Sequence, residues 1–363
     1  MHDTLSTASL GDRSQIGPPS KLAIIGPTYF SYIPTIVAEF RRRGLDVISF
    51  DEKHSNRVPD KIFYRLGLAH HRLSALSRYL RSVTRAITEA GCTDVLLTGV
   101  EVIDRQFVER LTRQQVRVHF YTWDGAANKG RFLSYLDLLE SKGTFDPVDC
   151  HRYGMDYIPL FAEEVFCSHH YSVPQNGHDV VFCGTVHSSR AKIVVQLLDI
   201  AQAKNLRTRL MLYYHSRRLF FIKGIVSRHA RRIASLISDK SFPKSQIAEM
   251  FAAAHYVLDV PHPGQSGMTA RTFEALMTGS RLLTLHGDAP ALLPPSFAER
   301  VTIIADISDL ESLAIGDSPR LPPLTDEQRY FLSLERFVDQ LMAMMQSSGS
   351  DQSANTDLLA TAQ

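Results

Sequence analysis

The chain has 363 residues, of which 44% are hydrophobic and 21% are charged, and its formal net charge at pH 7 is +2. This composition is normal for globular domains with full cores, and the length fits two domains of ordinary size. The small net charge excludes a global signal for binding polyanions, so any basic feature has to be local. The four cysteines show no CxxC or Cys/His ligand spacing, which suits a reducing cytoplasm and argues against zinc.

The outer limits of the folded part follow from polarity. No segment has 18 uninterrupted apolar residues, and the first twenty residues lack the apolar core of a secretory signal. We expect residues 1–20 to be a disordered arm and residues 347–363 to be a disordered tail. Between them we expect an N-terminal domain over 21–170, a C-terminal domain over 179–323 and a terminal helix over 324–346. The protein is expected to be cytoplasmic.

The first half alternates apolar strands with helices, which is the order of a doubly wound parallel sheet. The expected strands are KLAIIG (21–26), LDVISFD (45–51), TDVLLTG (93–99) and VRVHFYTWD (116–124), with Gly44 closing the first helix. A dinucleotide fingerprint would need GxGxxG after the first strand. Only Gly26 is present there, which disfavours NAD and FAD.

Asp124 ends the fourth of these strands, beside Trp123, the only tryptophan. The chemistry of an open α/β sheet gathers at the carboxyl ends of its strands. Asp124 is therefore a candidate general base for an acceptor hydroxyl. A role as N-cap of the following helix is equally open. We also expect Asp149 to cap the short helix formed by DCHRYG.

Two basic amphipathic stretches stand out. Residues 61–88 contain Lys61, Arg65, Arg72, Arg78, Arg81 and Arg85 and no acid, with leucines at helical spacing. Residues 215–237 contain Arg217, Arg218, Lys223, Arg228, Arg231 and Arg232 and no acid. Such helices favour an inner-membrane surface or an anionic, lipid-linked acceptor, whereas a solvated helix packed by its leucines is the alternative for the first. No nucleic-acid module accompanies them, so nucleic acid is not an expected partner.

The second half begins after the polar linker 168–179. VVFCG (180–184) is its first strand, and Gly184 and Thr185 close that strand. Arg190 falls in the first turn of the next helix, where a guanidinium suits a phosphate, although an ordinary surface arginine explains the pattern as well. Further expected elements are strands over 206–214, 255–260, 281–285 and 299–304, and helices over 241–254 and 325–345.

Residues 261–287 join two of these strands through a glycine-rich loop and a short helix. Glycines in the loop let backbone approach a ligand closely. We expect Thr269 to cap the helix and Gly279 to close it. Arg271 and Glu274 lie three residues apart and share a helix face. They suit the diphosphate and the ribose of a nucleotide sugar, but the spacing alone favours an ordinary solvated ion pair.

The segment HPGQSGMTARTFEALMTGSRLLT, together with residues 121–161 and DVVFCGTVHSSR at 179–190, resembles bacterial surface-polysaccharide glycosyltransferases of the CgeB-like, group 1 type. The resemblance implies an α/β protein of the GT-B fold, with two Rossmann-like doubly wound domains facing a cleft and a terminal helix that packs on the first domain. It implies transfer of a sugar from a nucleotide-sugar donor to a capsule, exopolysaccharide or lipopolysaccharide acceptor. The donor-binding residues that it implies are Gly184, Thr185, Arg190, Gln265, Ser266, Gly267, Met268, Thr269, Arg271 and Glu274.

The expected reaction needs no metal and no cofactor beyond the nucleotide-sugar co-substrate, because no Asp-x-Asp triplet ends a strand. Many retaining GT-B enzymes carry Glu-x7-Glu at this point. The residue eight positions before Glu274 is Ser266, which leaves the stereochemistry open. Two other functions stay open. One is a nucleotide-sugar epimerase with a GT-B-like fold, and the other is a non-catalytic GT-B-like binding subunit.

Overall fold

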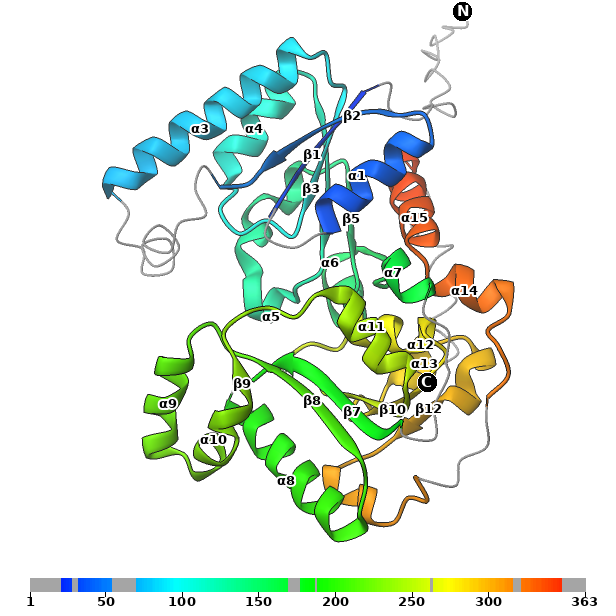
Figure 1. Ribbon diagram of the computed structural model, residues 1–363. Coiled ribbons are helices and arrows are strands. Elements are labelled where there is room, and N and C mark those ends of the chain that lie inside the picture. The colour runs from blue at the N-terminus through cyan, green and yellow to red at the C-terminus, as the bar shows by residue number, and fades with distance from the viewer. Residues whose placement is uncertain are drawn as a thin grey trace, which may run out of the picture.

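The computed structural model describes residues 21–27, 32–53, 70–168, 177–186, 188–261, 264–315 and 321–347. These residues form two lobes, each built around a six-stranded sheet in which every neighbouring pair of strands is parallel (Figure 1). The predicted pair of doubly wound domains is therefore confirmed. The arm expected over 1–20, most of the linker, the tail after Ser347 and residues 54–69 lie outside the described residues.

The first sheet has the strand order β2-β1-β3-β4-β5-β6. Its strands are β1 (Lys21–Gly26), β2 (Asp46–Asp51), β3 (Asp94–Thr98), β4 (Arg117–Thr122), β5 (Ser141–Thr144) and β6 (Asp156–Tyr157). The helices of this half are α1 (Tyr32–Arg42), α3 (His70–Glu89), α4 (Arg105–Arg113), α5 (Ala126–Lys129), η1 (Gly130–Leu138), α6 (Pro147–Tyr153) and α7 (Glu164–Cys167). The central strands read as apolar runs because helices cover both faces of the sheet.

Alternate residues of β1 show how the two faces are covered. Ala23 and Ile25 pack in a core with the leucines and valines of α3 and α4. Leu22 and Ile24 pack in a second core with residues of α1 and of the last helix, α15 (Leu334–Gln346). The period of two along the strand thus places successive side chains in different layers.

The second sheet has the strand order β12-β11-β10-β7-β8-β9. Its strands are β7 (His178–Thr185), β8 (Thr208–Tyr213), β9 (Ile237–Ser238), β10 (Ala254–Asp259), β11 (Arg281–Thr284) and β12 (Val301–Ile303). The surrounding helices are α8 (Ser188–Lys204), α9 (Arg217–Val226), α10 (Arg228–Ile233), η2 (Ala234–Leu236), α11 (Lys244–Ala252), α12 (Ala270–Met277), α13 (Ala289–Leu292), η3 (Pro295–Arg300), η4 (Ile307–Glu311) and α14 (Asp326–Leu332). Helices α8 and α10 share one core with the sheet, and α11 and α12 share the other.

The chain then returns from the second lobe to the first through α14 and α15 (Figure 1). The single helix predicted over 325–345 is wrong, because the chain breaks at Ser333. Ser333 has an extended backbone and caps α15 by accepting a hydrogen bond from the Arg336 N–H at 3.1 Å. The break lets the Leu332 carbonyl accept a hydrogen bond from the Ala162 N–H at 2.8 Å, so the two segments that cross between the lobes pair with each other.

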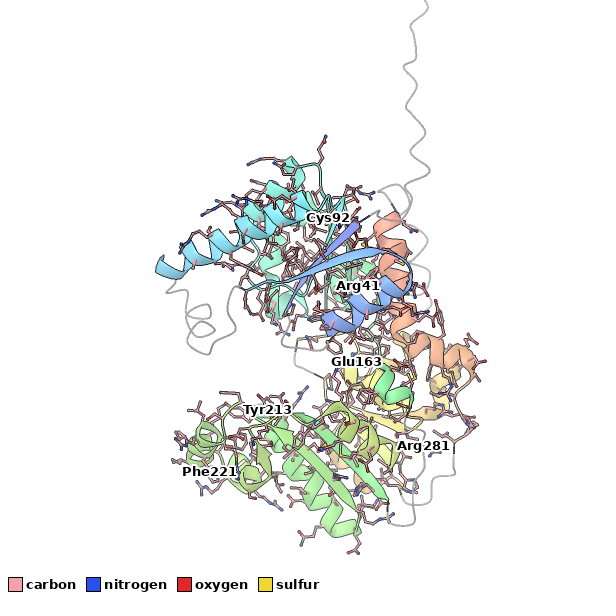
Figure 2. All side chains as sticks on the ribbon, turned by 45° about the horizontal axis from the view of Figure 1, so that its top comes forward. Arg41, Cys92, Glu163, Tyr213, Phe221 and Arg281 are labelled. Atoms are coloured by element: carbon pink, nitrogen blue, oxygen red, sulfur yellow. The ribbon has the colours of Figure 1, made fainter. Side chains whose placement is uncertain are left out.

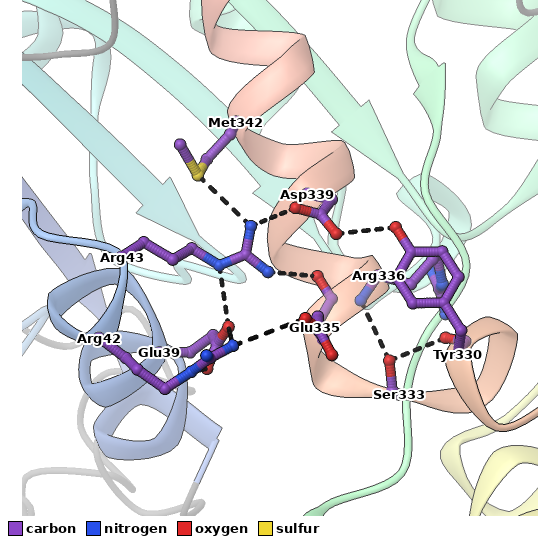
Figure 3. A network of polar contacts seen from close by, with 9 residues as sticks. All are labelled: Glu39, Arg42, Arg43, Tyr330, Ser333, Glu335, Arg336, Asp339 and Met342. Carbon is purple, nitrogen blue, oxygen red and sulfur yellow. Dashed lines mark hydrogen bonds and ion pairs between the residues drawn. The ribbon is translucent and has the colours of Figure 1, made fainter. Parts of the chain in front are cut away.

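A polar network holds α15 against α1, as Figure 3 shows. Arg43 donates to the Glu335 carbonyl at 2.9 Å and forms an ion pair with Asp339. The Tyr330 hydroxyl donates to the other oxygen of Asp339 at 2.7 Å. The last helix is therefore fixed on the first domain, as the resemblance implies.

A second correction concerns the cap of α6. The helix begins at Pro147, and its N-cap is Asp146, which accepts hydrogen bonds from the N–H groups of Val148 and Asp149. Proline is favoured at the first helical position because its missing N–H would have no partner there, and this places the cap one residue earlier. Asp149 is buried inside the first turn and accepts the Ala126 N–H at 2.6 Å instead.

Candidate functional site

The carboxyl ends of β7 and β10 form the centre of the candidate site. The two strands are neighbours, and β8 lies on the far side of β7, so the strand order reverses between them. Ligands of open α/β sheets bind outside such a switch point. The structure brings the predicted donor residues to this edge. Gly184 and Thr185 end β7, Arg190 lies in the first turn of α8, and the loop 264–269 leads from β10 into α12.

Arg190 links the ends of the two strands. Its guanidinium donates to the Val260 carbonyl at 2.6 Å and to the Thr185 carbonyl at 3.3 Å. Burial lowers the pKa of Arg190, while the nearby carboxylate of Asp259 acts in the opposite direction. Arg190 thus places a positive charge at this edge, and two nitrogens of its guanidinium already donate to main-chain carbonyls. Its contact with a phosphate stays a prediction.

The start of α12 is fixed on the last residue of β10. Thr269 accepts the Arg271 N–H at 3.1 Å, which confirms the predicted cap. The hydroxyls of Thr269 and Thr272 each donate to one oxygen of Asp259 at 2.8 Å. Asp259 is buried and was missed by the sequence analysis, although an acid that ends an apolar strand was the available signal. It sets the direction in which the first turn of α12 points.

Arg271 and Glu274 form an ion pair of 2.8 Å along α12, but the pair is not solvated. Glu274 is buried, and the Arg271 guanidinium lies 5.3 Å from the centre of the Phe251 ring. Burial raises the pKa of Glu274 although Arg271 acts to lower it. Burial also raises the pKa of Tyr32 on α1, and the carboxylate of Glu274 adds to this shift. The alternative of an ordinary surface ion pair is therefore wrong.

The loop before α12 is docked on the first domain. The Ser266 N–H donates to one oxygen of Asp146 at 2.9 Å, and the Ser266 hydroxyl bonds the other oxygen. A Cβ at Gly267 would overlap the carbonyl oxygen of Phe145, so this approach requires glycine. The loop thus already holds a carboxylate with the main-chain N–H of Ser266, one of the residues that the resemblance implies for donor binding.

The other loop residues differ in their exposure. Met268 is buried in the core beside α12, so its side chain packs and only its backbone lies along the loop. Gln265 is half-buried. The carbonyl of Ser266 lies 2.8 Å from the His286 ring, which follows β11 and helps to hold the loop.

Asp124 lies at the carboxyl end of the first sheet. It does not cap a helix, because α5 begins after Gly125 and has no side-chain cap. Instead, Lys129 lies 2.8 Å from Asp124 and 2.7 Å from Glu101. Gly125, the next residue, is close to the donor loop, since a Cβ there would lie 3.6 Å from the Gly264 carbonyl oxygen. The assignment of Asp124 as a base stays a prediction, now with a position beside the donor loop.

The ion pairs continue beyond Lys129. Lys53 lies 2.7 Å from Glu101 and 3.1 Å from Glu52, which is fully buried. This series of ion pairs therefore lies along the carboxyl ends of β2, β3 and β4. These ion pairs could not be predicted from the sequence, because their members come from separate loops.

The stabilisation by these ion pairs depends on pH because of Glu101. Burial acts to raise its pKa, but hydrogen bonds from Lys129 and Lys53 prevail and lower it to about 2. The pKa of Glu101 in the folded protein is thus below its value of about 4.3 in the unfolded chain. The ionised carboxylate therefore stabilises the fold fully above about pH 4.3, and this stabilisation is lost as the pH falls toward 2. A third of the side chain is exposed, so we expect Glu101→Gln to cost only about 1–2 kcal/mol at pH 7.

Urea unfolding of both proteins at pH 7 and near pH 3 checks this expectation. The difference in the free energy of unfolding between wild type and Glu101→Gln should be smaller at the lower pH. Glu109→Gln is a matched control, because Glu109 is equally exposed and pairs with Arg105 and Arg113 on the surface of α4. A difference that stays constant with pH would contradict the assigned role of Glu101.

None of the described helices has the length and apolar character to cross a membrane. Among the described residues, no three or more His, Cys, Asp or Glu side chains are grouped so that they could hold a metal ion.

Comparison with solved structures places this architecture in a known class. The structure of OtsA matches 91% of this chain and 100% of its own chain, with 11% sequence identity and a TM-score of 0.61. A trehalose-6-phosphate synthase studied with bisubstrate glycomimetics matches 89% of this chain and 98% of its own chain, with 10% sequence identity and a TM-score of 0.59. A UDP-GlcNAc 2-epimerase from Methanocaldococcus jannaschii matches 89% of this chain and 99% of its own chain, with 13% sequence identity and a TM-score of 0.51. No family model matches the chain, and no curated protein matches its sequence. The chain has the two-domain GT-B fold.

Proposed function

We propose that this protein is a glycosyltransferase that moves a sugar from a nucleotide-sugar donor to a growing surface glycan of the capsule, exopolysaccharide or lipopolysaccharide type. One observation carries the proposal. Arg190, Arg271, Glu274 and the capped start of α12 converge at the switch point of the second sheet, beside the loop whose Ser266 contacts Asp146 of the first domain. Two cations beside a helix start are suited to a diphosphate. The CgeB-like sequence pattern supports the class of acceptor.

In this proposal the two guanidiniums and the main-chain N–H groups from Ser266 to Thr269 bind the donor diphosphate, and Glu274 binds the ribose. The carboxylate of Asp146 now accepts the Ser266 N–H, so the donor replaces one anion by another at this loop. The ion pair between Arg271 and Glu274 opens at the same time, because each side chain takes a ligand group as its new partner.

The transfer step is an exchange of two bonds to oxygen at the anomeric carbon. The acceptor hydroxyl oxygen bonds to that carbon, while the bond to the diphosphate oxygen breaks and the nucleoside diphosphate leaves with the electron pair. Asp124 takes the hydroxyl proton. Arg190 and Arg271 stabilise the charge on the leaving group, which is the role that a metal ion has in other enzymes.

A thermal-shift screen tests the proposed donor site. Purified protein is heated with UDP, GDP, CMP and dTDP sugars, and a ligand at a hundred times its dissociation constant should add about 2.7 kcal/mol to the free energy of unfolding. We expect a shift for one nucleotide class, and we expect Arg271→Ala to abolish it. Arg113→Ala is the control, because Arg113 is a strongly exposed residue of α4. The absence of a shift with every donor would overturn the proposal and favour a non-catalytic binding subunit.

A nucleotide-sugar epimerase is the second candidate, since a solved UDP-GlcNAc 2-epimerase shares the fold across most of this chain. The two functions differ in the need for an acceptor. An epimerase converts its donor in the absence of any acceptor, whereas the proposed transferase releases the nucleoside diphosphate only when a glycan acceptor is added.

A further inference from the structure

Helix α9 has an unusual surface. Leu219, Phe221, Ile222 and Ile225 are 50, 54, 59 and 72% exposed. They make up four of the nine large apolar side chains that are exposed among the described residues. Single exposed apolar residues are common, but a cluster on one element indicates an interaction surface.

The apolar face of α9 is held in place from the other side of the helix. Phe220 packs into the core against Tyr214, with ring centres 5.1 Å apart. A Cβ at Gly224 would lie 3.2 Å from the Arg231 Cα, so α10 packs closely here. The Arg231 guanidinium donates to the carbonyls of Gly224 at 2.9 Å and Ile225 at 3.0 Å. Helix α9 therefore cannot rotate to bury its exposed face without breaking these contacts.

The charges around this face have one sign. No acidic residue occurs between Asp199 and Asp239. Arg217, Arg218 and Arg228 are exposed and have no ion-pair partner within the part of the chain that the structure describes. An apolar centre with unpaired arginines around it matches a bilayer surface that carries anionic lipids.

The structure assigns α9 as the element that docks this protein on an anionic phospholipid surface. A second copy of the chain fits less well, because a two-fold contact would bring these arginines against each other. A nucleic acid would leave the apolar side chains in water. The inference rests on the surface of α9 and not on the proposed function.

Helix α3, the other basic helix, contributes in a different way. Arg78, Arg81 and Arg85 are exposed, but the apolar side chains of Leu76 and Leu80 are buried in the core. For its described part, the alternative of a helix packed by its leucines is therefore correct. Figures 1 and 2 show α3 and α9 on the same flank of the two lobes. Helix α3 can thus add positive charge toward the same surface while α9 alone inserts.

Helix α9 starts at the same edge of the second sheet as the candidate site. Helix α9 follows β8, the direct neighbour of β7, and begins at the carboxyl edge of the second sheet. The donor-binding residues lie at the same edge. A protein docked through α9 would thus present this edge next to the bilayer, which is where the proposed reaction would meet an acceptor linked to a lipid.

Vesicle flotation tests the assignment, with the full-length protein and no nucleotide. One set of vesicles is pure phosphatidylcholine, and the other contains phosphatidylcholine with an equal share of phosphatidylglycerol. We expect binding only to the anionic vesicles, and we expect it to weaken as salt is raised. Binding to neither set, or equal binding to both, would overturn the proposal.

Variants locate the contact. Ile225→Asp should lower the bound fraction by about tenfold or more, because it places a charge at the most exposed of the four apolar side chains. Ile303→Asp is the matched control, since Ile303 is 41% exposed on β12 at the opposite edge of the same sheet and should leave binding unchanged. Equal losses in the two variants would refute the role of α9. If Ile225→Asp instead converts a dimer into a monomer, the occupant is a second copy and the assignment is wrong.

Discussion

Asp124→Asn is expected to lower kcat by about 100- to 10,000-fold and to leave the binding of the nucleotide sugar intact. The carboxylate would accept the proton of the acceptor hydroxyl in the transition state, and an amide cannot. Asp124 lies two residues after the end of β4, and its neighbour Gly125 lies close to the Gly264 carbonyl, so this position suits a group that acts on an acceptor. The measurement is initial-rate kinetics with the acceptor varied, together with the thermal shift given by the donor.

Asp137→Asn is the control for this experiment, because Asp137 belongs to the same domain and forms an exposed ion pair with Arg105. Its kcat should stay that of the wild type. A loss of donor binding in Asp124→Asn would mean that the residue positions the loop and is not a base. A kcat close to that of the wild type would place the base elsewhere in the first domain.

Much of the fold could be predicted from the sequence because the strands are buried on both faces and read as apolar runs. Strands β1, β3, β4 and β10 lie within two residues of their predicted bounds. Local chemistry also gave the ends of α12. Thr269 caps it, and Gly279 closes it with a φ of +83°, a conformation that glycine adopts without strain.

Contacts between distant segments could not be predicted in the same way. Asp146 and Ser266 are 120 positions apart, and no local pattern indicates that the loop before α12 rests on the first domain. The spacing of Arg271 and Glu274 predicts their ion pair but carries no information on its burial. The break at Ser333 was missed because the apolar period continues through it, and the pairing of Ser333 with Ala162 is itself a contact between distant segments.

Arg336→Met is expected to lower the free energy of unfolding by about 3 kcal/mol. The guanidinium is buried and donates to the carbonyls of Pro159 at 2.6 Å, of Phe331 at 3.0 Å and of Leu160. These carbonyls belong to the two segments that cross between the lobes. Burial lowers the pKa of Arg336 to about 10, so the group still carries its charge at neutral pH.

Methionine keeps much of the packing against Phe273 and Phe331, and removing a buried charge recovers part of its desolvation cost. The expected loss comes from three main-chain carbonyls, one buried and two partly buried, that lose the guanidinium as their donor. A buried acceptor left without a partner costs about 1–3 kcal/mol. Arg336→Lys should lie between wild type and Arg336→Met, because one ammonium cannot reach all three oxygens.

Urea unfolding provides the measurement, with Arg78→Met as the control on an exposed helix face. The control should change the free energy by no more than about 0.5 kcal/mol. Because Arg336 joins both crossing segments, we expect its loss to separate the unfolding of the two lobes, so that a single transition becomes two. A stable Arg336→Met protein with one transition would show that the contacts of α1 with α15 are sufficient to couple the lobes.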